Sequence, residues 1–195
     1  MNKLTRSQSF FAGALITAIT VGVFRSQIMT PVIQVSTPQV IVNQVKESQP
    51  DFVQEADQIQ SSLNPSKLRH LLVYIHGLSE YYGIDYELVK AVIATESSWD
   101  HRAKSSSDAR GLMQLKPATA YQVFETPTDQ LYDPYVNVTL GIMYLARLKD
   151  HHGFDSLSGQ LTAYSHGPTV TKTYNENYIG SNHYVKKVTD SYKPG

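Results

Sequence analysis

Apolar residues from Ser66 onward recur at intervals of three and four, the spacing that places side chains on one face of an α-helix. The first such face predicts a helix that ends at Gly83, because glycine readily adopts the backbone conformation of a helix terminus. Asp85 suits the N-cap of a second helix that runs to about Ser97. The apolar positions of the two faces are Leu71, Leu72, Ile75, Leu78, Tyr82, Leu88, Val89, Val92 and Ile93.

Prolines mark the start of two further helices. Pro117 opens one that extends to about Phe124, and Asp133 followed by Pro134 opens a longer one that stops at Gly153. The pattern also predicts shorter helices over residues 157–165, 169–178 and 182–190. Since no alternating pattern of a β-hairpin is visible, we expect a mainly α-helical domain.

The first 25 residues differ from the rest in having basic residues ahead of an uncharged, largely apolar stretch. Lys3 and Arg6 precede the fifteen residues Phe10–Phe24. This length suits the core of a signal peptide, and it is shorter than the roughly 20 residues that span a bilayer. Thr20 and Gly22 form only a mediocre cleavage site, so we expect residues 1–25 to be an uncleaved anchor, with a cleaved signal peptide as the alternative. The basic residues orient the N-terminus toward the cytoplasm and the rest away from it.

The composition changes near residue 65, because all 13 tyrosines lie from Tyr74 onward. We therefore interpret residues 26–64 as a linker and residues 65–195 as the folded domain. Helical spacing after Pro50 predicts a short amphipathic helix within the linker. This helix either docks on the domain or forms part of a stalk.

Composition excludes several classes of function. Lys+Arg and Asp+Glu both number 17, and a protein that binds nucleic acid would normally carry a basic excess, so we expect no nucleic-acid partner. The absence of cysteine excludes disulfides, cysteine nucleophiles and cysteine zinc sites. The seven histidines show no paired metal-ligand spacing. The sequence therefore predicts neither a metal site nor a cofactor.

Glu96 is the leading candidate for acid chemistry because of its position on a helix. It follows Ile93 by three residues, which places it on the apolar face, and it lies in the last turn, where the helix dipole disfavours negative charge. Both effects raise the pKa of a carboxyl group. A carboxylic acid that keeps its proton near neutral pH can act as a general acid on a glycosidic bond. The alternative is that Glu96 points outward or pairs with Arg110 or Lys104.

A series of short motifs surrounds Glu96, and together they are more specific than any one alone. In order, they are Glu96-Ser97-Ser98-Trp99, Ala109-Arg110-Gly111-Leu112-Met113-Gln114, Pro117-Ala118-Thr119-Ala120, Leu131-Tyr132-Asp133-Pro134-Tyr135-Val136-Asn137, Tyr144-Leu145 and Ala163-Tyr164-Ser165-His166-Gly167-Pro168. In order and spacing, this series resembles the soluble lytic transglycosylase (SLT domain) family, which cleaves peptidoglycan. The resemblance covers about residues 70–190. It implies a lysozyme-like helical fold for residues 65–195.

The resemblance also implies roles for individual residues. Glu96 matches the catalytic acid and base, and Ser105 matches the serine that helps orient the acid and the substrate. Gln114 closes the motif that lines the glycan groove, and Tyr164 matches the active-site tyrosine. The expected substrate-binding residues are Ser97, Ser105, Met113, Gln114, Tyr164 and Ser165.

The family chemistry needs one carboxyl group, whereas most glycosidases need two. Asp100 and Asp108 are the residues available as a second carboxylate. The resemblance instead implies that Glu96 protonates the oxygen between N-acetylmuramic acid and N-acetylglucosamine. The resulting carboxylate then deprotonates the muramoyl C6 hydroxyl as a 1,6-anhydro ring closes.

Two departures from the family pattern leave other functions open. Ser165 stands where the family usually has asparagine, and Gly180 stands where it usually has glutamate, although Ser181 and Tyr184-Val185 nearby are similar to the Thr-x-x-Tyr-Val motif. The alternatives are a hydrolytic muramidase on the same fold and a non-catalytic glycan-binding module of the envelope. The expected partners are peptidoglycan strands and, through residues 10–24, the inner membrane. We expect a periplasm-facing location, in wall remodelling or in secretion, conjugation or virion assembly.

Overall fold

The computed structural model describes residues 50–150 and 152–194, and every regular element in these ranges is a helix. This confirms the mainly α-helical fold class. The elements are α2 (Phe52–Gln58), α3 (Pro65–Tyr82), α4 (Tyr86–Ser97), α5 (Pro117–Phe124), the 3₁₀-helix η1 (Thr128–Tyr132), α6 (Pro134–Asp150), α7 (Leu157–His166), α8 (Pro168–Thr171), α9 (Glu176–Ser181) and α10 (His183–Ser191).

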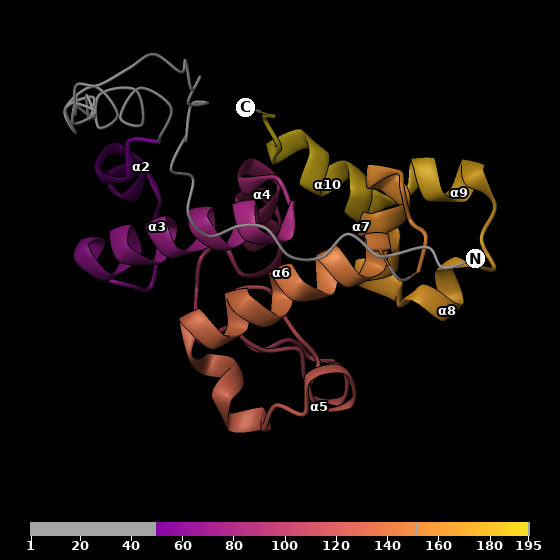
Figure 1. Cartoon of the computed structure of the whole chain (residues 1–195), viewed down its shortest axis with the longest axis horizontal. Coiled ribbons are helices and arrows are strands. Elements are labelled where there is room, and N and C mark those ends of the chain that lie inside the picture. The colour runs from indigo at the N-terminus through magenta and orange to yellow at the C-terminus, as the bar shows by residue number, and fades with distance from the viewer. Residues whose placement is uncertain (1–49, 151, 195) are drawn as a thin grey trace, which may run out of the picture. The chain divides into compact units, whose positions relative to one another are not determined.

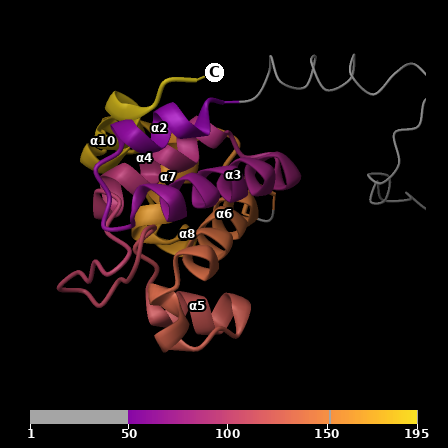
Figure 2. The same cartoon turned by 90° about the vertical axis from the view of Figure 1, so that its left-hand side faces the viewer.

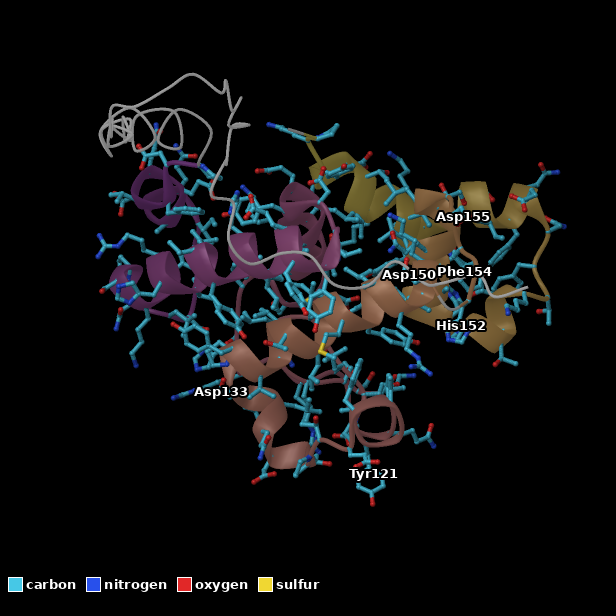
Figure 3. The ribbon with its side chains drawn as sticks, in the orientation of Figure 1. Tyr121, Asp133, Asp150, His152, Phe154 and Asp155 are labelled. Atoms are coloured by element: carbon cyan, nitrogen blue, oxygen red, sulfur yellow. The ribbon has the colours of Figure 1, made fainter. Side chains whose placement is uncertain are left out.

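Side-chain caps fix the starts of the helices near the predicted positions. The Asp85 carboxylate accepts hydrogen bonds from the backbone N–H groups of Glu87 and Leu88 at 2.7 and 3.2 Å. Asp133, at the start of α6 (Figure 3), accepts bonds from the first turn in the same way. Gly83 follows α3 with a left-handed φ of 63°. Each cap satisfies orphan backbone groups, so local sequence decides these boundaries.

The prediction of one helix over residues 169–178 was wrong, because two shorter helices occupy this region. α8 ends at Thr171, and α9 begins at Glu176. Asn175 between them has an extended backbone, and its side chain accepts a hydrogen bond from the N–H of Tyr178 at 2.8 Å. A side-chain cap of this kind starts a new helix rather than continuing the old one.

The long helix α6 lies at the centre of the domain and packs against α3 and α7. In both views α5 lies at one end, α2 and α10 lie at the other, and α6 runs between them (Figures 1 and 2). The fully buried side chains Ile142 and Leu145 of α6 join one core cluster with residues of α3, α4, α7 and α10. Gln160 of α7 donates a buried hydrogen bond to the Leu145 carbonyl at 2.9 Å, which ties α7 to α6.

The short helix expected after Pro50 is present as α2, and it packs on the core. Ala56 is buried, and Phe52 contacts the same core cluster and stacks edge-to-face on His76 of α3. The Tyr86 hydroxyl donates to the Glu55 carboxylate at 2.6 Å. These contacts decide between the two alternatives left open for this helix, since it docks on the domain.

The expectations for the N-terminal region concern residues 1–49, which lie outside the described residues. They are the anchor or signal peptide at residues 1–25 and most of the linker. Of the helices in residues 50–194 that the structure describes, none has the length and apolar character needed to cross a bilayer. The prediction for Phe10–Phe24 therefore stays a prediction.

Because α2 docks on the core, a charge introduced at its buried residue Ala56 should destabilise the fold. We expect Ala56→Glu to lower the free energy of unfolding by about 2–3 kcal/mol, because it forces a larger, charged side chain into a filled site. The matched control is Gln54→Glu, which adds the same charge at an exposed position of α2. Urea denaturation of the full chain measures both. Equal stability of the two variants would contradict the docking of α2.

Candidate active site

The segment between α4 and α5, residues 98–116, has an unusual backbone. Left-handed φ angles occur at the non-glycine residues Ser98, Trp99, Asp108 and Gln114, and at Gly111. Such residues cost free energy and persist only where the surroundings hold them. The segment forms the irregular loop that extends from the helices on the left of Figure 2.

Asn137 of α6 holds this loop from within the core. Its side-chain amide donates to the carbonyls of Arg110 and Leu131, both at 2.9 Å, and its oxygen accepts from the N–H of Met113 at 2.7 Å. The side chain is completely buried, so these bonds are shielded from water. Gly111 passes directly over it, and a Cβ there would overlap the Asn137 amide and the Leu131 carbonyl.

Glu96 lies in the last turn of α4 and faces α10. The Tyr184 hydroxyl of α10 donates to Glu96 Oε1 at 2.6 Å. Burial raises the pKa of the Glu96 carboxyl, while the Tyr184 hydrogen bond and the positive charge of Lys187 lower it, with burial the largest effect. The Lys187 ammonium is held nearby by a hydrogen bond to the Thr95 carbonyl at 3.2 Å.

The two cations considered as alternative partners of Glu96 lie elsewhere. The Lys104 ammonium and the Arg110 guanidinium each contact Asp108 Oδ1 at 3.0 Å. The hydrogen bonds from Lys104 and Arg110 lower the pKa of the exposed Asp108 carboxyl. Asp108 is therefore a paired carboxylate on the loop, and Glu96 does not form the ion pairs that would have made it a structural residue.

Glu96 lines a cavity of about 470 Å³ that is open to solvent. The cavity lies between the end of α4, the 98–116 loop, the start of α5, the middle of α6, the end of α7 and the start of α10. Four of the predicted substrate-binding residues line it together with Glu96, namely Ser105, Gln114, Tyr164 and Ser165. Among the described residues that line it, Glu96 is the only carboxylate, since Asp100 and Asp108 both lie outside.

The predicted residues in the cavity wall are held by hydrogen bonds. The Tyr164 hydroxyl donates to the Met113 carbonyl at 2.7 Å. The Gln114 amide donates to the carbonyls of Ala103 and Gly111 at 3.1 and 3.0 Å, which leaves its oxygen free to accept. The Ser105 hydroxyl accepts from the N–H of Ala109 at 3.0 Å. The wall is therefore preorganised.

The structure does not bring Met113 and Ser97 into the cavity. The Met113 side chain is completely buried beneath the wall, where a Cβ on Gly141 would overlap its sulfur. The Ser97 hydroxyl donates back to the Ile93 carbonyl at 3.1 Å and borders a separate hollow beside Ser61. Helical periodicity explains the second result, since Ser97 is one residue, and about 100°, around the helix from Glu96.

Tyr144, His166 and Tyr184 also line the cavity, and none of them is among the site residues expected from the sequence. The signal for Tyr184 was the Tyr-Val pair that matches the family motif, and the signal for Tyr144 was the Tyr144-Leu145 motif. Neither pattern shows that Tyr184 reaches Glu96, because 88 residues separate them.

A half-buried carboxyl group with a raised pKa, in the wall of a cavity open to solvent, suits general-acid catalysis. The chain belongs to the Transglycosylase SLT domain family, whose model matches residues 73–185. It is 38% identical over 93 residues to the membrane-bound lytic murein transglycosylase E of Buchnera aphidicola subsp. Baizongia pistaciae, covering 43% of this chain and 44% of that protein.

Two solved structures have a similar fold. The 70 kDa soluble lytic transglycosylase Slt70 of Escherichia coli matches with a TM-score of 0.51 and 27% identity, over 60% of this chain and 23% of that one. An inactive mutant of the lytic transglycosylase Slt of Pseudomonas aeruginosa matches with a TM-score of 0.50 and 21% identity, over 63% of this chain and 25% of that one. These matches confirm the lysozyme-like helical fold. The chain spans less than half of the curated relative and about a quarter of the two solved chains.

Because Asn137 lies so close to Gly111, adding a methyl group at Gly111 should strongly destabilise the fold. We expect Gly111→Ala to lower the free energy of unfolding by about 3 kcal/mol or more, because strain from a φ of 76° adds to overlap with Asn137. Gly83 is the matched control, since its φ is 63° but a Cβ added there would meet no atom within 4 Å, so Gly83→Ala should cost about 1 kcal/mol. Chemical denaturation compares them, and equal losses would show that the overlap is not significant.

Proposed function

We propose that this chain is a peptidoglycan lytic transglycosylase that cleaves the bond between N-acetylmuramic acid and N-acetylglucosamine without consuming water. The observation that carries the proposal is Glu96, a carboxyl group with a raised pKa in the wall of an open cavity that no other described carboxylate lines. Membership of the SLT domain family and the murein transglycosylase relative support it.

The first step requires a protonated acid. Burial keeps the proton on Glu96 at a higher pH than in an exposed glutamate. The acid donates this proton to the glycosidic oxygen as the bond from that oxygen to the muramoyl C1 breaks. The N-acetyl group of the substrate stabilises the positive charge that develops on C1.

The second step requires the same group as a base. The Glu96 carboxylate takes the proton of the muramoyl C6 hydroxyl, and the C6 oxygen forms a bond to C1. Between the two steps the negative charge must be stabilised, and the Tyr184 hydroxyl at 2.6 Å and the nearby Lys187 supply this stabilisation. The proton returns to Glu96, so the atoms balance without water and the acid is restored.

The remaining cavity residues have positions suited to holding the substrate. We assign substrate binding to Ser105, Gln114, Tyr164 and Ser165, which line the cavity with Glu96. The free carbonyl oxygen of Gln114 can accept a hydrogen bond from a sugar hydroxyl or an amide N–H. Ser165 occupies the place of the usual asparagine, and its hydroxyl contacts His166 Nδ1 at 2.7 Å.

The substrate class suggests where the enzyme works. We infer that residues 65–195, together with the docked helix α2, form the catalytic domain, and that residues 1–25 anchor it to the inner membrane. A periplasm-facing position in the cell envelope would place the cavity near peptidoglycan. The relative described as membrane-bound supports this inference.

Replacement of the acid tests the proposal most simply. We expect Glu96→Gln to lower the rate of cleavage of isolated cell walls by about 100-fold or more, the size of a general-acid contribution. Glu125→Gln, at an exposed position after α5, is the matched control and should retain activity. Mass spectrometry of the wild-type products should show 1,6-anhydromuramoyl ends, which are one water lighter than reducing ends.

Other outcomes identify the alternatives. Reducing ends in the wild-type products would indicate a hydrolytic muramidase on the same fold. Binding to cell walls without cleavage would indicate a glycan-binding module. Unchanged lysis by the Glu96→Gln variant would exclude Glu96 from the mechanism.

The pH profile tests the contact between Glu96 and Tyr184. Tyr184→Phe removes a hydrogen bond that lowers the pKa of Glu96, so that pKa should rise. Because the general acid must be protonated, the loss of kcat/KM at high pH should move to higher pH. We also expect kcat to fall about tenfold, because a hydrogen bond to the carboxylate is lost.

Tyr192→Phe is the control for this experiment. The Tyr192 hydroxyl also donates to a carboxylate, that of Asp85 at 3.0 Å, but neither residue lines the Glu96 cavity. Its pH profile should match that of the wild type. A Tyr184→Phe profile that is unchanged or moves to lower pH would contradict the assigned role.

A further inference from the structure

Three aromatic rings gather where α7 ends and α9 begins. The Tyr174 and Tyr178 rings lie in contact, with centroids 4.2 Å apart and planes tilted by 43°. The His166 ring meets them edge-on, with centroids 5.7 Å from that of Tyr174 and 6.3 Å from that of Tyr178. We refer to His166, Tyr174 and Tyr178 as the aromatic cluster.

Core packing does not explain the aromatic cluster. His166 is exposed, and 42% of Tyr178 remains accessible to solvent. None of the three rings packs against the core clusters within residues 50–194 that the structure describes, whereas Tyr164 and Tyr184 do. Tyr174 is half-buried between the two exposed rings. Large rings that stay accessible to solvent outside the core suit contact with a ligand.

The aromatic cluster continues the wall of the Glu96 cavity. His166 belongs to both, since it lines the cavity with Ser165 and Gly167 and also meets both tyrosine rings. The hydrogen bond between Ser165 Oγ and His166 Nδ1 at 2.7 Å fixes the histidine ring at this junction. α7, α8 and α9 lie together at one end of the domain (Figure 1), so the surface runs outward from the cavity.

The chemistry of the rings fits a sugar. A pyranose presents C–H groups on one face, which stack on aromatic rings, and hydroxyl groups at its edge, which a tyrosine hydroxyl can bind. We propose that the aromatic cluster is an outer subsite that binds a hexosamine ring of the glycan strand beyond the sugars next to the cleaved bond. This inference rests on the proposed function, because the strand that would reach the aromatic cluster past His166 is the one cleaved at Glu96.

The test compares long and short substrates in the full chain. In the Tyr174→Ala/Tyr178→Ala double variant, we expect KM for long peptide-free glycan strands to rise about fivefold to tenfold, as for the loss of aromatic stacking. Cleavage of short fragments that fill only the cavity should not change, because they do not reach the tyrosines. The Tyr174→Phe/Tyr178→Phe variant keeps the rings and should retain a KM within about twofold of the wild type.

Tyr81→Ala controls for the loss of an exposed tyrosine that contacts a neighbouring tyrosine ring. Tyr81 is 79% exposed and meets the Tyr82 ring with centroids 4.9 Å apart, but it does not line the cavity. Its KM for long strands should equal that of the wild type.

Several results would overturn the outer subsite. One is an unchanged KM of the Ala double variant for long strands, and another is an equal loss of cleavage on short and long substrates. A third is a loss of cleavage seen only on strands that carry stem peptides, because this would mean that the rings bind a peptide. If the wild type cleaves no glycan of any length, the proposed function fails instead. Calorimetry with N-acetylglucosamine oligomers then decides the subsite separately: weaker binding of long oligomers by the Ala double variant supports it, and equal binding overturns it.

Discussion

The hydrogen bond from Tyr184 to Glu96 connects the fold to the chemistry. It joins the end of α4 to the start of α10 across 88 residues of sequence, and it acts on a carboxyl group whose pKa is raised by burial. Burial favours the protonated acid, whereas Tyr184 and Lys187 favour the carboxylate. A group that gives and then regains a proton needs both influences, because neither of its charge states can be too unfavourable.

A second constraint shapes the part of the cavity wall that the 98–116 loop forms. Residues 98–116 adopt left-handed φ angles at several non-glycine positions, a conformation that costs free energy. Hydrogen bonds of the buried Asn137 side chain offset this cost and hold the backbone around Met113. The absence of a Cβ at Gly111 leaves room for Asn137 to approach the backbone. Since Tyr164 donates to the Met113 carbonyl, α6 and α7 position the loop together. The core thus fixes the geometry of the site.

Local signals in the sequence were sufficient for most helices and for the environment of Glu96. Caps such as Asp85 and the three-residue and four-residue periodicity depend on neighbouring residues, so they can be recognised without the fold. The partner of Glu96 could not be found in this way, because Tyr184 reaches it only through tertiary packing. The same holds for Met113, whose motif does not show that its side chain is buried while its carbonyl faces Tyr164. Asn175 is a suitable N-cap residue and could have indicated the start of α9, but the helical periodicity on both sides of it predicted one continuous helix.

The acidity of Glu96 is the most direct measure of this balance. Carbon-detected NMR of the full chain, with Glu96 assigned by comparison with Glu96→Gln, would follow its carboxyl group as the pH changes. We expect a pKa above that of an exposed glutamate, because burial outweighs the hydrogen bond and the lysine charge. A pKa equal to or below that of an exposed glutamate would contradict the assignment of Glu96 as a protonated general acid.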